Sequence, residues 1–315
     1  MMKNHVMNKI SYNCIGCGIC EGVCPKNCIV IEEKSNKGIV PIVDETKCID
    51  CGICLNYCPT EKLSENENVS NIKKVYTGYS KDNEIIKKTS SGGIVTSTLV
   101  TLFKNNNIDA ALVAFIDKNL NVYGDFITNE EEVLDHSGSF YHTSKMLVNI
   151  KKIKKYKSIA FVGLPCQNIA LERFIKKNNV SNIFFKISIF CTIGRMKNGF
   201  DEFLKSEGID KENITSYKPR VGEIRPGNLV FETMNNNQIT INNNNNFYQM
   251  DYFYLPKGCM NCKKLFGNEY SDISVGDDWG DKRETKIAIF SINSEKGQTI
   301  IDKNNLIWFY HENSG

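Results

Sequence analysis

The sequence predicts a small α+β module with an internal pseudo-twofold repeat, followed by an α/β domain whose C-terminal part is richer in strands. Three observations indicate this fold class. A cysteine phrase occurs twice within the first 60 residues, apolar runs typical of strands and helices alternate from about residue 75, and glycine and proline interrupt the chain after about residue 217. The expected bounds are 1–63 for the module, 64–72 for a linker, 73–210 for the α/β domain and 211–315 for the C-terminal domain.

The repeated phrase has the spacing C-x2-C-x2-C-x3-C-P. It begins at Cys14 and ends at Pro25, and it returns 34 residues later from Cys48 to Pro59. This run is typical of modules that hold two [4Fe–4S] clusters, in which the fourth cysteine of each run binds the other cluster. The expected ligands are Cys14, Cys17, Cys20 and Cys58 for one cluster, and Cys48, Cys51, Cys54 and Cys24 for the other.

The residues around the cysteines fit a cluster better than a zinc ion. Gly16, Gly18 and Gly52 allow the backbone to approach a cluster, and a proline after each fourth cysteine ends the turn. Zinc knuckles also use C-x2-C pairs, but they need neither a third cysteine at the same step nor the proline. With short strands expected at 28–32 and 38–43, we predict a ferredoxin-like α+β fold that carries single electrons.

Five of the thirteen cysteines lie outside the two ligand sets. Cys28 stands where an apolar residue would pack, and we expect it to behave as a small hydrophobe. The other four equal the number that one more cluster requires. From the residues alone, a zinc site and a Cys166–Cys191 redox pair remain alternatives. These four cysteines are Cys166, Cys191, Cys259 and Cys262.

The α/β domain is expected to contain strands at 74–79, 110–115, 159–162 and 183–190, with helices at 94–103 and 168–177. The first helix follows the segment Thr89-Ser-Ser-Gly-Gly93. Consecutive glycines at a helix start can present backbone N–H groups to a phosphate, whereas a serine alone would be a plain N-cap. Both interpretations stay open for Ser90 and Ser91.

Composition restricts the partners and the compartment. The formal charge of +3 argues against nucleic acid as the main partner. Many cysteines without an apolar leader fit a reducing cytoplasm, and the longest apolar run, 183–190, is interrupted by Lys186, so no direct membrane insertion is expected. The lysine-rich run 151–157 is either a solvated helix face or a docking surface for an acidic partner. The Asn242–Asn246 tract is expected to be a loop.

The residues after the linker resemble those of the coenzyme F420 hydrogenase and dehydrogenase beta subunits. Four phrases in the same order carry the resemblance, which covers nearly everything after the linker. They are Ser90–Gly93 with its helix, Gly138–Tyr141, Gly163–Gln167, and Cys259–Cys262 leading to Asp272–Gly280.

The resemblance implies a flavin-binding α/β domain with FAD and a third [4Fe–4S] cluster on Cys166, Cys191, Cys259 and Cys262. Arg220 and Arg225 are candidates to pair with the pyrophosphate, although arginines in a turn are often ordinary surface residues. Two departures are Phe140, where the family often has lysine, and the chain end at Gly315, which suggests a truncated C-terminal domain. The implied flavin contacts are Ser91, Gly92, Gly93, Ser139, Tyr141 and Gln167.

The implied function is that of an iron–sulfur flavoprotein oxidoreductase. It would transfer electrons between a small-molecule hydride donor or acceptor at FAD and the clusters, with a redox partner protein or a ferredoxin beyond them. The alternatives are a non-catalytic electron-transfer subunit serving a partner enzyme, a coenzyme F420H2-oxidising subunit, and a reductase associated with polysaccharide biosynthesis. No catalytic acid or base is nominated, because His136 and His142 beside a motif are more often structural.

Overall fold

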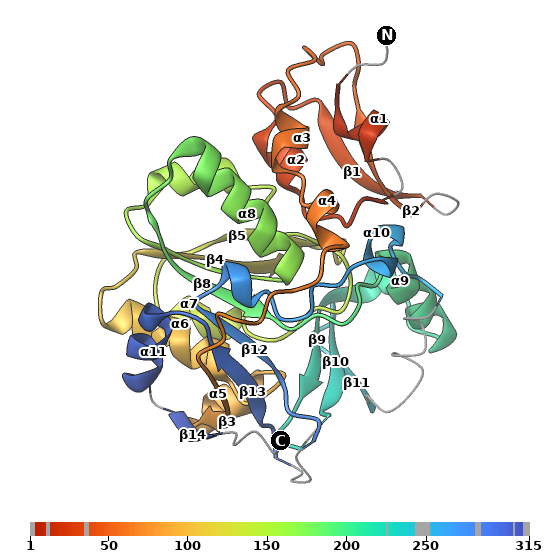
Figure 1. Cartoon of the computed structure of the whole chain (residues 1–315). Helices are drawn as coiled ribbons and strands as arrows, with labels where there is room; N and C mark the ends of the chain where they lie inside the picture. The colour runs from red at the N-terminus through yellow and green to blue at the C-terminus, as the bar shows by residue number, and fades with distance from the viewer. Residues whose placement is uncertain are drawn as a thin grey trace.

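The computed structural model describes residues 4–10, 13–34, 38–224, 226–242, 253–280, 285–304 and 306–310. A small N-terminal module stands at one end of a larger body (Figure 1). The body contains a nine-stranded central sheet and a separate three-stranded sheet. The predicted combination of a ferredoxin-like module with a mixed α/β body is confirmed.

The N-terminal module is built from two similar halves. Gly18 and Gly52 precede the α2 and α3 helices, and both adopt left-handed backbone conformations (φ 83° and 68°) that glycine tolerates without strain. Between the halves, β1 and β2 form an antiparallel hairpin that pairs Ile29 with Val43. The elements are α1 (Val6–Lys9), α2 (Ile19–Val23), β1 (Ile29–Lys34), β2 (Gly38–Val43), α3 (Ile53–Tyr57) and α4 (Thr60–Leu63).

The central sheet has the strand order β14-β3-β13-β12-β8-β7-β4-β5-β6. Its middle strands β12, β8, β7 and β4 run parallel to one another, and the other pairings are antiparallel except for β5 with β6. The strands are β3 (Lys74–Ser80), β4 (Ala110–Ile116), β5 (Val122–Ile127), β6 (Ser144–Lys145), β7 (Ile159–Gly163), β8 (Ile183–Ile189), β12 (Ile273–Asp277), β13 (Ala288–Ile292) and β14 (Leu306–Tyr310).

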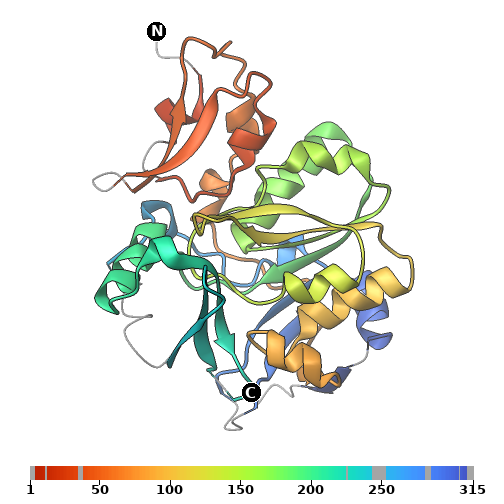
Figure 2. The same ribbon diagram turned by 180° about the vertical axis from the view of Figure 1, so that it is seen from behind.

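Helices cover both faces of this sheet (Figures 1 and 2). Side chains of α6 and α11 pack in one core with β3, β12 and β13, whereas α8 packs in a second core with β4, β7 and the N-terminal module. These helices are α5 (Asn83–Lys88), α6 (Ile94–Lys104), α7 (Glu131–Asp135), α8 (Pro165–Asn178) and α11 (Glu295–Asp302).

The strand-rich region expected after residue 217 is a three-stranded antiparallel sheet with the order β11-β10-β9. Aromatic residues of α9 fill its core, since the rings of Phe200 and Tyr217 lie 4.5 Å apart. Its elements are α9 (Lys197–Ser206), β9 (Ile214–Val221), β10 (Asn228–Thr233) and β11 (Gln238–Asn242). The chain then passes through α10 (Lys257–Met260) and returns to the central sheet as β12 and β13.

Two predicted segments differ in detail. The helix expected at 168–177 begins at Pro165, because proline suits a first helical position and the Gln167 side chain accepts a hydrogen bond from Leu164 N. The lysine-rich run forms a short 3₁₀ helix, Ile150–Lys155. One of its lysines stabilises the fold, since Lys152 forms an ion pair with Asp125 at 2.8 Å. Residues 243–246 of the asparagine tract lie outside the described residues.

The module and the body share one apolar core. Ile15, Ile19 and Val23 of the module are buried with Leu147 and Phe161 of the body. Gly22 marks the closest approach, since a Cβ atom there would lie 2.3 Å from the Leu147 carbonyl oxygen. Among the helices of the described part of the chain, none is both long enough and apolar enough to cross a membrane.

Candidate functional site

The first cysteine group lines a cavity bordered by α1, α2, the β1–β2 hairpin and the start of α4. Three of its members come from the first phrase and Cys58 comes from the second. We call this cavity, with its empty volume of about 290 Å³, the inner site. Burial, followed by the neighbouring Cys58 and Cys259 thiols, raises the pKa of Cys14 to about 12, so the metal-free thiol is protonated at neutral pH.

The second cysteine group lines a cavity of about 340 Å³, which we call the outer site. Cys48, Cys51 and Cys54 come from the second phrase and Cys24 comes from the first. The crosswise grouping expected from the spacing is therefore present in both cavities. Cys51 is exposed at the outer site, whereas Cys14, Cys17 and Cys20 of the inner site are all buried.

The cavities suit a group larger than one ion. Within the part of the chain that the structure describes, no three His, Cys, Asp or Glu side chains come close enough to hold a single metal ion. A zinc site would need four such ligands at bonding distance of one atom. The thiols instead surround a space, as the ligands of a cubane cluster do.

The remaining four cysteines form a third group. Cys166 lies at the start of α8, Cys191 follows β8, and Cys259 and Cys262 flank the end of α10. Burial, followed by the thiols of Cys191 and Cys259, raises the pKa of Cys166 well above its usual value. This gathering matches the expectation from the C-x2-C pair and from loops at the ends of neighbouring parallel strands.

The third group borders the inner site. Cys166, Cys259 and Cys262 pack against the apolar core that contains Cys17. A Cβ atom at Gly258 would lie 2.2 Å from the carbonyl oxygen of Asn13, the residue before Cys14. The inner and outer sites also adjoin each other, since Cys20 and Cys54 are buried in one apolar core. The three cysteine groups therefore form a row from the body to the outer end of the module.

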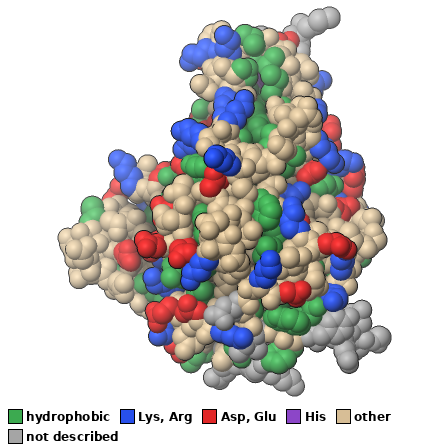
Figure 3. Space-filling view, turned by 90° about the vertical axis from the view of Figure 1, so that its left-hand side faces the viewer, with side chains coloured by type: hydrophobic (Ala, Val, Ile, Leu, Met, Phe, Trp, Pro, Cys, Tyr) green, Lys and Arg blue, Asp and Glu red, His purple; other side chains and the backbone are tan. Residues whose placement is uncertain are grey.

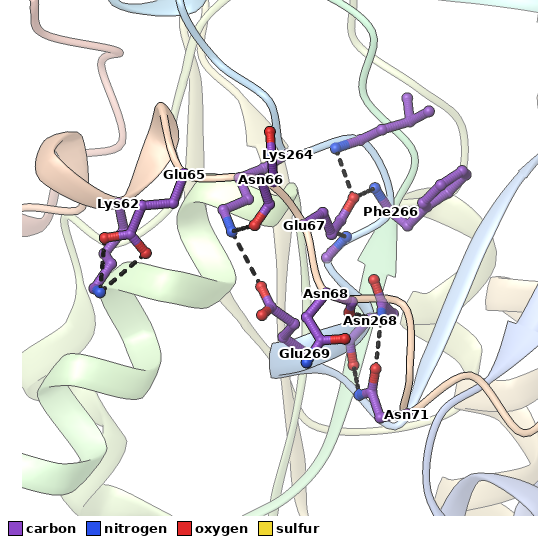
Figure 4. A network of polar contacts seen from close by, with 12 residues as sticks. Lys62, Glu65, Asn66, Glu67, Asn68, Asn71, Lys264, Phe266, Asn268 and Glu269 are labelled. Carbon is purple, nitrogen blue, oxygen red and sulfur yellow. Dashed lines mark hydrogen bonds and ion pairs between the residues drawn. The ribbon is translucent and has the colours of Figure 1, made fainter.

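Residues 64–71, expected as a linker, are bound to the loop that carries Cys262. The Glu67 carboxylate accepts hydrogen bonds from the backbone N–H groups of residues 265–267, two of them at 3.0 and 2.8 Å (Figure 4). The buried Lys264 ammonium donates to the Asn66 carbonyl at 3.2 Å and pairs with Glu269. Because Leu265 O accepts a hydrogen bond from Cys191 N, this segment supports two members of the third group.

Most of the serines, glycines and amides implied as flavin contacts are used by the fold itself. Ser91 Oγ donates to Ile287 O at 3.1 Å, and the Ser139 N–H donates to Ser90 Oγ at 2.9 Å. A Cβ atom at Gly92 would lie 2.4 Å from Gly78 O, and Gly93 has φ 76°, so both positions require glycine. Gln167 caps α8 and donates to Ser144 Oγ at 3.0 Å.

Arg220 lies at the centre of this region. Its guanidinium is 2% exposed, donates to Tyr141 Oη at 3.2 Å, and forms an ion pair with Asp277. Its Nη2 atom and Asp277 Oδ1 are buried without a hydrogen-bond partner among the described residues. Such orphaned polar atoms fit a bound polar group. Arg225, the second expected arginine, lies outside the described residues.

The sequence analysis missed Lys286, a second buried cation beside Arg220. Its ammonium donates to the carbonyl oxygens of Thr89, Ile86 and Arg220, and so ties the Ser-Gly-Gly turn to the end of β9. Burial, followed by the Arg220 charge, lowers the pKa of Lys286 to about 8. No sequence motif marks this lysine. Asp277 was quoted only as part of a phrase, although it pairs with Arg220 and ends β12 directly beside the cysteine-bearing end of β8.

Phe140 and the histidines beside it have packing roles. The Phe140 ring meets Tyr217 edge to face at 5.6 Å in the core of the three-stranded sheet. His142 packs on Phe200, and burial lowers its pKa to about 4. A neutral, buried imidazole agrees with the structural role expected for it.

Three family models match this chain. The 4Fe-4S dicluster domain matches residues 13–62. The N-terminal and C-terminal domains of the coenzyme F420 hydrogenase/dehydrogenase beta subunit match residues 75–151 and 156–307. Nearly the whole chain is therefore assigned to these two kinds of domain.

Two similar proteins come from methanogenic archaea. Over 84% of its length the chain is 26% identical to a coenzyme F420-dependent sulfite reductase of Methanocaldococcus jannaschii, but it spans only 42% of that protein. Over 56% of its length it is 29% identical to one of the subunits of the F420H2 dehydrogenase of Methanosarcina mazei, and it spans 53% of that polypeptide.

The fold is similar to a chain of the F420-reducing [NiFe] hydrogenase complex from Methanosarcina barkeri. The TM-score is 0.58 at 20% identity, and the likeness covers 75% of this chain and 81% of that one. It bears on the fold alone. The matched domains lead to one conclusion: the chain belongs to the family of coenzyme F420 hydrogenase/dehydrogenase beta subunits and carries an N-terminal 4Fe-4S dicluster domain.

Proposed function

We infer that this chain is an oxidoreductase subunit that passes electrons between a hydride-exchanging flavin site in the body and a partner docked at the outer site. The observation that carries this inference is the row formed by the three cysteine groups. Cys166 packs against the same apolar core as Cys17, and Cys20 shares a core with Cys54, so each group is adjacent to the next. A route for single electrons needs such a series of neighbouring clusters.

The third cysteine group and the Arg220 region meet at one edge of the central sheet. The parallel strands β7, β8 and β12 end next to Cys166, Cys191 and Asp277 respectively. The carboxyl ends of parallel strands are the usual place for a ligand in α/β folds. FAD bound there would supply the conversion between hydride transfer and single-electron transfer.

The chain's own groups fit an anionic, flavin-type ligand. Arg220 and Lys286 place two buried positive charges beside the Ser-Gly-Gly turn, and Arg220 Nη2 has no hydrogen-bond partner in the part of the chain that the structure describes. Pro226 O, Tyr141 and Asp277 hold the Nε and Nη1 atoms and fix the plane of the guanidinium, which leaves Nη2 to donate to a phosphate oxygen. The exposed Trp279 ring lies 5.3 Å from the guanidinium and closes one side of this region.

The outer end of the module suits a protein partner. Ile49, which lines the outer site together with the exposed Cys51, is 57% exposed. Figure 3 shows hydrophobic side chains on this module close to groups of Lys and Arg side chains. A small apolar contact with a charged rim is typical of brief electron-transfer encounters.

The hydride donor is proposed from the relatives, two of which are named for coenzyme F420 or F420H2. Phe140 does not argue against this donor, because its ring lies in the core beside Tyr217 and not beside Arg220. Reduced coenzyme F420 is therefore the first donor to test, and other hydride carriers are second.

The test is anaerobic purification followed by iron, sulfide and flavin assays. The proposal expects about twelve irons and one FAD per chain, since each cubane holds four irons. About eight irons without flavin would favour the alternative of a non-catalytic electron-transfer subunit. Mixing the protein with reduced coenzyme F420 should then bleach the flavin absorbance, and no bleaching would exclude this donor.

A further inference from the structure

The outer site contains one thiol more than a cubane needs. Five cysteines line this cavity, and the fifth is Cys28. Its Sγ lies 3.4 Å from the Sγ of Cys24, and the side chain is 6% exposed. Cys28 also packs with Ile29 and Val43, so the apolar role expected from the sequence holds as well. Packing alone does not require a thiol in contact with an expected cluster ligand.

The local backbone explains how Cys28 reaches the cavity. After Cys24 and Pro25 the chain makes a turn, in which Asn27 has φ 47° and its N–H donates to Cys24 O. Asparagine tolerates this left-handed conformation better than most residues. The turn brings residue 28 back to the cavity just before β1 begins at Ile29.

The inner site lacks this feature, although the module is pseudo-symmetric. The residue equivalent to Cys28 after the 34-residue offset is Lys62. After Cys58 and Pro59 the chain enters α4 (Thr60–Leu63), and the Lys62 ammonium pairs with Glu65 at the surface. Lys62 is not among the residues that line the inner site. The extra thiol is therefore specific to the outer site.

We propose that Cys28 is an alternative ligand of the outer cluster and can take the place of Cys24. In the exchange, the iron–sulfur bond of Cys24 breaks, the Cys28 thiol transfers its proton to the Cys24 thiolate, and the new Cys28 thiolate binds the same iron. One bond replaces another, one proton moves between two sulfurs 3.4 Å apart, and no electron is gained or lost. The site most open to solvent thus has a replacement ligand.

The proposal depends on the outer ligand set but not on the flavin. Four variants test it: Cys24→Ala, Cys28→Ala, the double variant, and Cys58→Ala as the matched change at the inner site. Each is purified anaerobically, and iron per chain and the EPR spectrum of the reduced protein are measured. We expect both outer single variants to keep all their iron, and we expect the double variant and Cys58→Ala each to lose about four irons.

The pattern separates the competing explanations. Loss of about four irons in Cys24→Ala alone would overturn the proposal, and loss in Cys28→Ala alone would make Cys28 an obligatory ligand instead. Full iron in the double variant would show that neither thiol binds the cluster. If an alanine variant does not fold, judged by its melting curve, the corresponding serine variants are compared in the same way. A shifted EPR signal in the Cys24 variant, absent in the Cys28 variant, is the expected signature of the replacement ligand.

Discussion

The inner and outer sites share one cysteine phrase but lie in different surroundings. At the inner site, the body covers the cysteines, and Leu147 N donates a hydrogen bond to Cys17 O. At the outer site, Cys51 is exposed and Cys48 is half-buried. The same local sequence therefore makes one site that faces the body and one that faces solvent. Ligand spacing therefore determines where a cluster can bind, whereas the surrounding packing determines which neighbours can exchange electrons with it.

The largest effect is expected from removing one ligand at each site. Cys17→Ala and Cys51→Ala should each lose about four irons per chain. Their electron transfer should differ, since the inner site adjoins the third cysteine group through the core that Cys17 and Cys166 share. With a hydride donor in a stopped-flow experiment, Cys17→Ala should fail to reduce the outer cluster, and Cys51→Ala should still reduce the inner one. Equal behaviour of the two variants would contradict the proposed order.

Iron removal should also distinguish the two sites. An exposed cluster is open to chelators and oxygen, whereas a covered one requires local opening of the structure first. We expect brief air exposure with an iron chelator to release about four irons in a fast phase, assigned by EPR to the outer cluster. A single phase that removes iron from all sites together would show that the body does not protect the inner site.

Glu67→Gln should destabilise the loop after Cys262, next to the third cysteine group, and should leave the outer site unchanged. A neutral amide accepts more weakly than a carboxylate, and this carboxylate accepts from three backbone N–H groups. A loss of about 2 kcal/mol of stability is expected. The matched control is Glu65→Gln, which should leave the melting temperature unchanged because, among the described residues, Glu65 pairs with the exposed Lys62 alone. If Glu65→Gln lowers the melting temperature as much as Glu67→Gln does, the stabilising role assigned to Glu67 is wrong.

In each site, one cysteine is followed by a proline. The backbone carbonyl of that cysteine accepts a hydrogen bond from a positively charged side chain of the body. Lys151 Nζ donates to Cys24 O at 2.6 Å, and the Arg173 guanidinium donates to Cys58 O. A cation favours the reduced, more negative cluster, so removing it should lower the midpoint potential. Lys151→Met should lower the outer potential and Arg173→Met the inner one, each by about 30 mV in a redox titration. The exposed Lys155, changed to Met, is the control and should alter neither potential.

The smallest effect is expected in the body, where the binding groups are not cysteines. The pKa of Lys286 is lowered to about 8, so its ammonium is charged at pH 7 and loses its proton as the pH rises above 8. Anion binding beside Arg220 should weaken accordingly. A fluorescence titration with FAD should show about threefold weaker binding at pH 9 than at pH 7. In Lys286→Met the affinity should be weaker at pH 7 and should no longer depend on pH over this range.

Much of the module was predictable because its information is local. Two phrases of twelve residues define the cysteine spacing, and the glycine and proline positions follow from the same turns. The strands and helices of the α/β body were likewise visible as apolar periods, with α8 beginning three residues earlier than predicted. The family resemblance, carried by four short phrases, is confirmed by the matched domains.

The polar region around Arg220 was only partly predictable because its groups are far apart in the chain. Lys286 donates to Thr89, almost two hundred residues earlier, and no spacing rule connects them. Residues 64–71 looked like a polar linker, yet Glu67 is bound to the loop after Cys262. Such contacts depend on how β12 and β13 return to the central sheet after the three-stranded sheet, and short-range patterns do not encode that path.

The sequence by itself determined the kind of cofactor site in the module and the family to which the chain belongs, because spacing and short phrases fix local geometry. Only the tertiary structure decided that the two sites are not equivalent. It covers Cys17 with the body, leaves Cys51 exposed, and turns Cys28 but not Lys62 toward a cavity. The physical reason is that burial and contact are properties of packed surfaces, and identical phrases acquire them from different neighbours.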